Sequence, residues 1–159
     1  MEQKTLAKWL KAILIGIGVC GAILYGWLLP AIGRDIVVDY PEFSNRYWPW
    51  LAFLWATGLP CFVVLVLGWQ IADAIGRDRS FTLSNARRLT WISRLAAGDA
   101  AFLFAGNAAL VLLNMHHPGV FLAMMAVVFA GAAVAVAAAC LSHLVQKAAA
   151  LQEQSDLTI

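Results

Sequence analysis

Charged side chains are scarce in this chain. Lysine, arginine, aspartate and glutamate together make up 13% of its 159 residues, whereas a soluble domain usually carries about a quarter. The chain also lacks a polar stretch long enough to form a separate soluble catalytic or DNA-binding domain. We therefore expect a single domain over residues 1–159 and no direct binding of nucleic acid.

Cysteines and clustered metal ligands are equally rare. Cys20, Cys61 and Cys140 are isolated within apolar stretches, and no Cys-x-x-Cys pair exists. This spacing favours small hydrophobic packing residues over a redox dithiol. The His116–His117 pair has no third metal ligand near it in sequence. We expect neither an enzyme activity nor a bound cofactor.

Hydrophobic residues dominate instead, at 62% of the chain. They form four long stretches, and about 20 apolar residues in helical form cross the hydrocarbon of a bilayer. Within lipid, a helix satisfies its own backbone hydrogen bonds. The sequence therefore predicts an all-α integral membrane four-helix bundle, with spans near residues 9–30, 48–75, 95–115 and 120–145. The first span is longer than a signal-peptide core, so we expect it to be retained.

Positive charge is distributed unevenly around these spans. Nine of the eleven lysines and arginines lie at the N-terminus, between the second and third spans, or in the C-terminal tail. An excess of basic residues marks the cytoplasmic side, so we expect both termini in the cytoplasm of a bacterial cell, below its inner membrane. On the opposite side, Tyr47, Trp48 and Trp50 are expected to anchor the second span, because amphipathic rings favour the headgroup level.

The segment between the second and third spans predicts a cytoplasmic amphipathic helix. Leu83, Ala86, Leu89 and Ile92 recur at helical spacing among arginines, and Ser80 or Thr82 can cap the helix. Attraction to anionic lipid, worth about 1 kcal/mol per basic residue near the surface, explains the arginines. A docking surface for a cytoplasmic protein is the alternative. The residues of this partner or lipid surface are Arg77, Arg79, Phe81, Asn85, Arg87, Arg88 and Arg94.

The same segment resembles a signature of DUF2975, a bacterial four-span membrane family of unknown function. That signature, Gly-x-x-Phe-Ser/Thr-x-x-Asn-x-x-x-Leu, lies between the second and third spans. Here it matches Gly76, Phe81, Thr82, Asn85 and Leu89, with two extra residues after Gly76. The four-span layout matches over the whole chain. Such proteins are often encoded beside a small helix-turn-helix regulator, so the resemblance implies a transcription factor as a membrane-held partner. It implies no catalytic residues.

Four polar residues within the spans form a candidate intramembrane site. Charge is expensive inside a bilayer, and Asp99 lies five residues beyond Arg94 in the third span. His143 is expected at a similar depth on the fourth span, within contact of Asp99. Asn107 and Asn114 follow on nearly the same side of the third span. These side chains either line a polar path or join helices by hydrogen bonds.

Two functions remain open at this point. The first is a regulatory or interaction scaffold whose inner basic segment holds a cytoplasmic partner. The second is a small transporter or channel, assembled as a homo-oligomer, with its path along the third span. Small residues repeat every four positions on that span, which lets helices approach closely within one subunit or between subunits. The repeat consists of Ala97, Ala101, Ala105 and Ala109.

Overall fold

The protein is helical along nearly all of its described length. The computed structural model describes residues 3–113 and 118–156, and these contain no strand. Two short turns of other helix types, η1 and η2, interrupt the α-helices. The elements in chain order are α1 (Gln3–Ile23), η1 (Leu24–Leu28), α2 (Leu29–Asp39), η2 (Pro41–Arg46), α3 (Tyr47–Gly76), α4 (Leu83–Leu112) and α5 (Pro118–Asp156).

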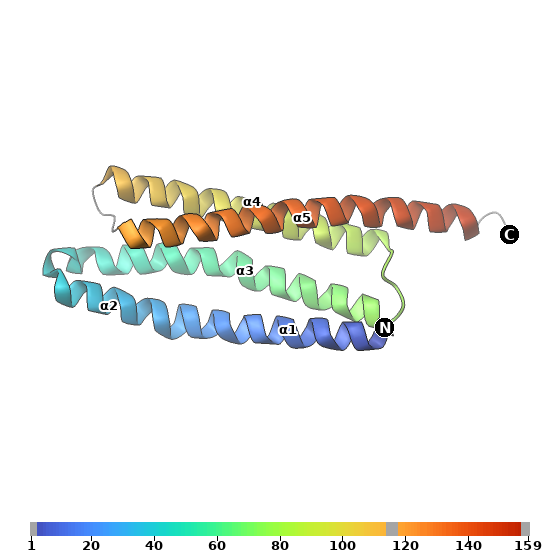
Figure 1. The fold of residues 1–159 in the computed structure, drawn as a ribbon, viewed down its shortest axis with the longest axis horizontal. Coiled ribbons are helices and arrows are strands. Elements are labelled where there is room, and N and C mark those ends of the chain that lie inside the picture. Colours follow the sequence, from blue (N-terminus) through green and yellow to red (C-terminus); the bar gives the residue numbers. More distant parts are fainter. Residues whose placement is uncertain (1–2, 114–117, 157–159) are drawn as a thin grey trace.

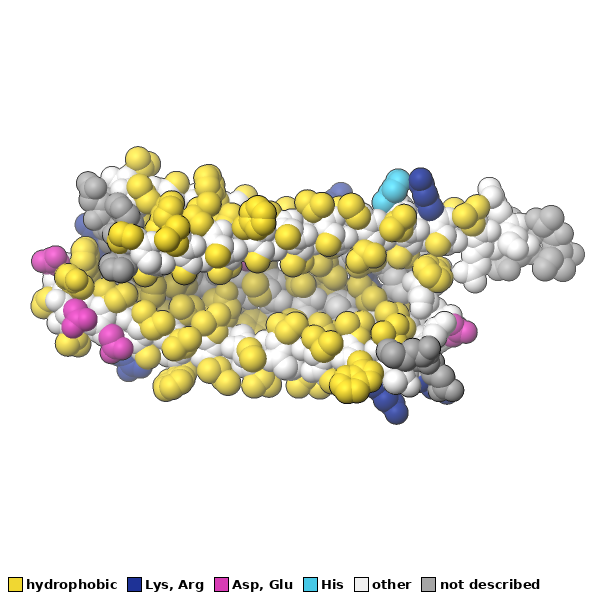
Figure 2. Space-filling view, in the orientation of Figure 1, with side chains coloured by type: hydrophobic (Ala, Val, Ile, Leu, Met, Phe, Trp, Pro, Cys, Tyr) yellow, Lys and Arg dark blue, Asp and Glu magenta, His cyan; other side chains and the backbone are white. Residues whose placement is uncertain are grey.

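Four helical stretches are long and apolar enough to cross a membrane, which confirms the all-α four-span prediction. They run over Gln3–Asp39, Pro41–Gly76, Leu83–Leu112 and Pro118–Ser155. Hydrophobic side chains cover the length of the visible face, while charged side chains gather toward its two ends (Figure 2). Lipid-facing apolar side chains over a hydrogen-bonded helical backbone are what a bilayer requires.

The first helical stretch is longer than its predicted span of residues 9–30. It continues through η1, a π-helical turn in which the Leu29 N–H reaches the Leu24 carbonyl, into α2. Pro30 explains the widened turn, because its ring has no N–H and crowds the preceding carbonyls. The residues between the first two predicted spans thus form most of α2 and the 3-10 turn η2.

The basic segment and the third span form one continuous helix, α4. The sequence suggested a separate amphipathic helix feeding a span that begins near residue 95, but α4 starts at Leu83 and runs to Leu112 without a break. In the same way, α5 extends past residue 145 to Asp156, so the polar tail is largely helical. Both helices extend beyond their apolar stretches into polar sequence, because Arg, Gln and Glu are good helix formers.

Both ends of the described chain lie at the same end of the molecule (Figure 1). The connection between α3 and α4, residues 77–82, lies there too. We call this the basic end, because nine of the eleven basic residues belong to it or to the adjoining helix turns. The opposite end carries α2, η2 and the start of α3.

The four spans pack in the order α1, α3, α4, α5. Helix α1 contacts α3, α3 contacts α4, and α4 contacts α5 most extensively. Side chains from several spans meet in one apolar cluster toward the opposite end, centred on Leu54, Leu103 and Met124, with Leu29 packed against it. The bundle is therefore closed by side chains near the opposite end and is an open row of helices elsewhere.

Small residues set the close approach of α4 and α5, but not the predicted ones on α4. A Cβ added to Gly131 would lie 3.3 Å from the Ala100 Cβ, and Ala135 and Ala138 are buried. On α4, the small residue opposite Gly131 is Ala100, which is buried and lies one position from the predicted repeat. That repeat is exposed to the surroundings at all four positions, which are Ala97, Ala101, Ala105 and Ala109.

We predict that Gly106→Ala destabilises the bundle. A Cβ at Gly106 would overlap the Phe53 ring, which itself packs on Phe102 with ring centroids 5.1 Å apart. Overpacking of this kind costs about 1–3 kcal/mol. Thermal unfolding in detergent measures the effect, and Gly98→Ala is the matched control on the same helix, since nothing lies within 4 Å of its added Cβ. Equal stability of the two variants would contradict this packing.

Candidate functional site

The α3–α4 connection is fixed by its own side chains. Gly76 ends α3, and Thr82 caps α4 by accepting a 3.3 Å hydrogen bond from the Asn85 N–H. Asn85 is only 1% exposed, and its side-chain amide donates to the carbonyls of Arg79 (3.0 Å) and Ser80 (3.1 Å). A short polar side chain near a helix start commonly ties down the preceding chain in this way. Of the two predicted caps, Ser80 and Thr82, it is Thr82 that caps the helix.

Arg88 extends this network to α3. Its guanidinium donates to the Asn85 side-chain oxygen at 2.7 Å and to the Gln70 side-chain oxygen at 3.0 Å. Asn85 therefore uses both ends of its amide, one on the connection and one on Arg88. The Arg88–Gln70 hydrogen bond therefore joins the start of α4 to the last turns of α3.

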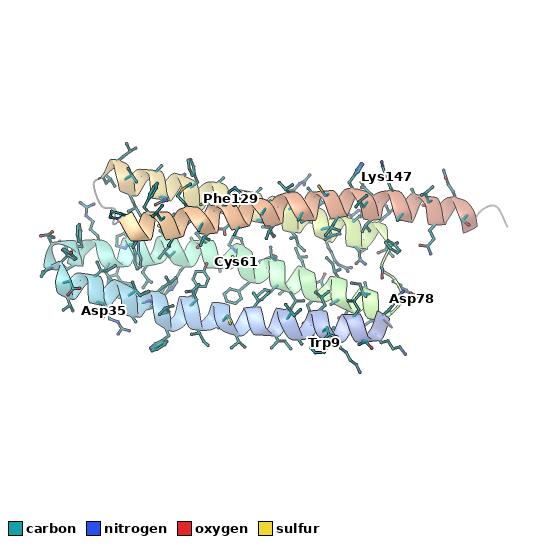
Figure 3. All side chains as sticks on the ribbon, viewed as in Figure 1. Trp9, Asp35, Cys61, Asp78, Phe129 and Lys147 are labelled. Atoms are coloured by element: carbon teal, nitrogen blue, oxygen red, sulfur yellow. The ribbon has the colours of Figure 1, made fainter. Side chains whose placement is uncertain are left out.

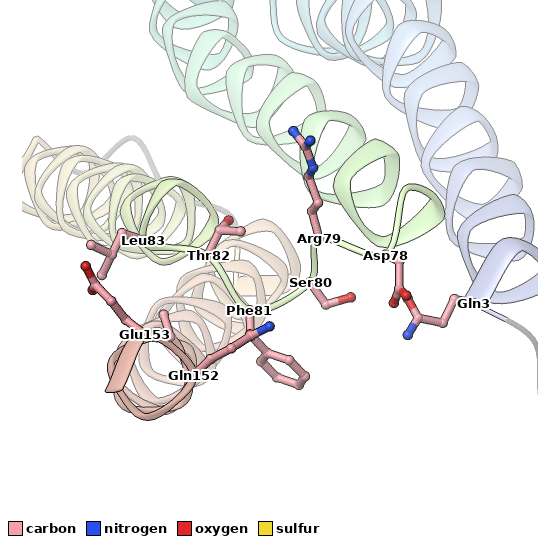
Figure 4. A pocket seen from close by; sticks show the side chains of 10 residues that line it. Gln3, Asp78, Arg79, Ser80, Phe81, Thr82, Leu83, Gln152 and Glu153 are labelled. Carbon is pink, nitrogen blue, oxygen red and sulfur yellow. The ribbon is translucent and has the colours of Figure 1, made fainter. Parts of the chain in front are cut away.

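A groove opens beside this connection at the basic end. It has a volume of about 720 Å³, and α1, the connection, the start of α4 and the last turns of α5 line it. Phe81 is 57% exposed and lies beside Gln152 of α5, while Arg79 points away on the other side of the connection (Figure 4). Exposed Leu83 and buried Ala149 add apolar surface, with Glu153 at the rim. The other lining residues are polar or charged, so the groove combines a small apolar surface at Phe81, Leu83 and Ala149 with a polar surround.

The predicted surface residues thus divide by role. Asn85 and Arg88 hold the connection, whereas Phe81 is displayed by it. Arg87 and Arg94 lie on exposed faces of α4, with the Arg94 guanidinium 5.9 Å from the centre of the Trp91 ring.

A polar cluster lies inside the spans around Asp99. Its Oδ2 accepts a hydrogen bond from the Cys61 thiol of α3 at 3.8 Å, and Cys61 lies about midway along α3 (Figure 3). Asp99 is eight residues beyond Trp91, or about 12 Å deeper at 1.5 Å per residue. Its other oxygen, Oδ1, is buried and has no partner among the described residues. An ionisable group placed this way is a functional candidate.

Two further polar side chains connect this cluster to the first span. The Tyr25 hydroxyl lies 3.3 Å from the Thr57 hydroxyl and also interacts with Cys61. Gly58 leaves room for the ring, because a Cβ there would lie 3.1 Å from a Tyr25 carbon. The cluster therefore draws on α3, α4 and the π-helical turn η1.

The predicted contact between Asp99 and His143 is not formed. The Ser142 hydroxyl donates to the Ala86 carbonyl at 2.7 Å, while Gly131 packs on Ala100. This register puts exposed His143 about 17 Å along the helix from the level of Asp99. The prediction placed the two residues at a similar depth. The charged end of α4 extends about two turns beyond Arg94, to Arg87, so Asp99 lies deeper in its span than His143 does.

Asn107 is buried within the protein, as a residue of an interhelical site would be. It is 1% exposed, and its side-chain nitrogen has no partner among the residues that the structure describes. Asn114 and the His116–His117 pair lie outside the described residues.

Of the predicted interfacial anchors, only Trp48 is strongly exposed. Tyr47 and Trp50 instead pack around Gly33, where an added Cβ would lie 2.8 Å from either ring. The close approach of α2 to α3 therefore uses two rings that the sequence assigned to the membrane surface.

Exposed tryptophans at both ends of the spans form the better interfacial markers. Trp48 and Trp69 are 21 residues apart on α3, or about 31 Å, which matches a hydrocarbon core of about 30 Å. Trp91 of α4 lies at the level of Trp69, because Arg88, one turn outward from Trp91, bonds to Gln70. Amphipathic indoles favour the headgroup level, so these residues position the bundle in the bilayer.

Fold and composition define this chain as an all-helical membrane protein with four potential spans. It belongs to the family described as Protein of unknown function (DUF2975), whose model matches residues 31–159. It is also similar to the Uncharacterized membrane protein YoaS of Bacillus subtilis (strain 168), with 24% identity over 160 residues that cover 99% of each chain. No solved structure matches it. The family resemblance drawn from the Gly76–Leu89 segment is confirmed.

Sequence reasoning missed Tyr25, Thr57 and Cys61 as neighbours of Asp99. Each is a weakly polar residue within an apolar stretch, and one such residue alone carries little signal. Their common feature is depth, since Thr57 and Cys61 lie more than two turns from Trp48 and Trp69 on α3, and Tyr25 lies opposite Thr57. Comparing the depths of polar residues across spans is the signal that finds them.

We predict that Asn85→Ala loosens the α3–α4 connection. The change removes hydrogen bonds to two carbonyls and to Arg88, and we expect a loss of about 2–3 kcal/mol in stability. Hydrogen exchange of residues 77–84 measures the loosening directly. Ser84→Ala, at the exposed neighbouring position, is the control and should leave exchange unchanged. Protection that survives in Asn85→Ala would rule out this role.

Proposed function

We propose that this protein is a regulatory scaffold of the bacterial cytoplasmic membrane that holds a cytoplasmic protein partner at its basic end. The observation that carries the proposal is the fixed display of Phe81. Buried Asn85 and capping Thr82 hold the connection in place, and the aromatic ring remains 57% exposed beside an open groove. Exposed aromatic side chains on a rigid frame are typical anchors of protein interfaces.

The groove suits an amphipathic helix from the partner. Its walls offer apolar contact through Phe81, Leu83 and Ala149, and acidic groups through Asp78 and Glu153. A helix-turn-helix regulator is the partner that the family resemblance suggests. The charge distribution supports a cytoplasmic location for this end and for both termini, since basic residues accumulate on that side.

One experiment tests both the partner and the sidedness. In one variant a photo-crosslinking amino acid replaces Phe81. In a second variant, the control, it replaces exposed Tyr40 at the opposite end of the molecule. We expect a DNA-binding regulator to be captured in native membranes from position 81 and not from position 40, with identification by mass spectrometry. Capture of lipid or of this chain alone would overturn the partner. Capture of a periplasmic protein from position 81 would overturn the sidedness.

The second candidate is a small transporter or channel built from several copies. The observation in its favour is a pair of buried polar atoms on the same helix, Asp99 Oδ1 and Asn107 Nδ2, which have no partner within the described part of the chain. The exposed alanine repeat of α4 offers a face on which a second copy can pack closely.

For this candidate we predict that Asp99→Asn reduces proton or cation flux into liposomes at least tenfold, because the charge at about 12 Å depth is lost. Flux is followed with a pH-sensitive dye and a set of monovalent cations. Asp35→Asn, which changes an exposed acid at the opposite end, is the control. No flux above empty liposomes in the wild-type protein eliminates the transporter.

A further inference from the structure

A second groove lies on the other side of the α3–α4 connection, between the end of α3 and the start of α4. It has a volume of about 350 Å³. Three arginines line it, which are Arg77, Arg79 and Arg88, and the hydroxyl residues Thr82 and Ser84 lie beside them. This concentration of guanidinium and hydroxyl donors is the chemistry that recognises a phosphate group.

The arginine at the base of the groove is already oriented. Hydrogen bonds to Asn85 and Gln70 hold Arg88 half-buried between the two helices. Arg77 and Arg79 are exposed at the rim, and neither forms an ion pair with an acid among the described residues, so they can close over an anion. Because α4 begins at Leu83, the positive end of its helix dipole also faces this groove.

The one acid lining this groove is engaged elsewhere. Asp73 forms an ion pair with Lys11 of α1, and the Lys11 amine also lies 4.9 Å from the centre of the Trp69 ring. With Asp73 paired to a lysine from outside the groove, three positive charges remain there. The groove therefore favours an anionic ligand.

The depth of this groove relative to the bilayer indicates which anion it binds. Gln70, which holds Arg88, follows directly after the interfacial residue Trp69, and Arg88 lies one turn outward from Trp91 on α4. One helical turn is about 5.4 Å, so Arg88 lies just outside the hydrocarbon core that these two indoles mark. Phosphates of membrane lipids lie at this level, and basic pockets between spans bind such headgroups.

We propose that this groove binds the phosphate of an anionic phospholipid from the leaflet at the basic end. Arg88 receives the phosphate at the base of the groove, and Arg77 and Arg79 cover it from the aqueous side. The acyl chains lie along the exposed apolar surface of α3 and α4 below. Arg79 and Thr82 line both this groove and the Phe81 groove, but Arg77 and Arg88 line this one alone, so lipid binding does not depend on a protein partner at Phe81.

Native mass spectrometry of the purified protein tests the proposal, with phosphatidylglycerol as the probe and phosphatidylcholine as the neutral comparison. We expect one tightly retained phosphatidylglycerol. The double variant Arg77→Gln, Arg79→Gln should weaken it about tenfold, and both residues are exposed, so folding is preserved. The double variant Arg87→Gln, Arg94→Gln removes the same charge from the same end outside the groove and should retain the lipid.

Three outcomes would overturn the site. Equal weakening in both double variants would reduce the effect to general attraction between charged surfaces. Equal retention of phosphatidylcholine would show that the phosphate groove does not select an anionic lipid. Displacement of the lipid by millimolar inorganic phosphate would make the ligand a free phosphate rather than a headgroup.

Discussion

A peptide group within hydrocarbon has no solvent to bond with, and this constraint shapes the whole molecule. Each span must be a helix, and polar side chains within it must find partners in the protein. The helices are joined by different kinds of contact along the length of the bundle. Near the opposite end, apolar side chains such as Leu54 and Leu103 close the bundle. Further along, polar contacts join the helices, first between Cys61 and Asp99 and then between Gln70 and Arg88.

This gradient separates two regions with different chemistry. The middle of the bundle has a weakly hydrogen-bonded acid beside a thiol, and one of its oxygens is unpartnered within the described chain. The basic end has a fully bonded asparagine that fixes an exposed connection with two grooves, one on each side. The better-ordered network belongs to the basic end. We assign the proposed scaffold function to the basic end because a surface that binds a partner must keep its shape when the partner is absent.

Much of the fold follows from the sequence because lipid imposes a simple rule. Four apolar stretches give four helices, and Gly76 and Thr82 mark where the second ends and the third begins. The interhelical register does not follow. It depends on side-chain fits such as Gly131 on Ala100 and Ser142 on Ala86, which many alternative alignments of small residues resemble. The expected Asp99–His143 contact failed for this reason. The packing of Tyr47 and Trp50 on Gly33 did not follow either, because a ring packed on a neighbouring helix and a ring at a headgroup look alike in sequence.

The packing order α1, α3, α4, α5 also has a consequence for biogenesis. The backbone of each outer helix of the row closely approaches a single neighbouring span, and that neighbour is adjacent in translation order. The two hairpins can therefore form one after the other as the chain leaves the ribosome. The two hairpins are joined mainly where α3 packs on α4, so a substitution that disrupts this interface would leave two folded hairpins that are not associated in the bilayer.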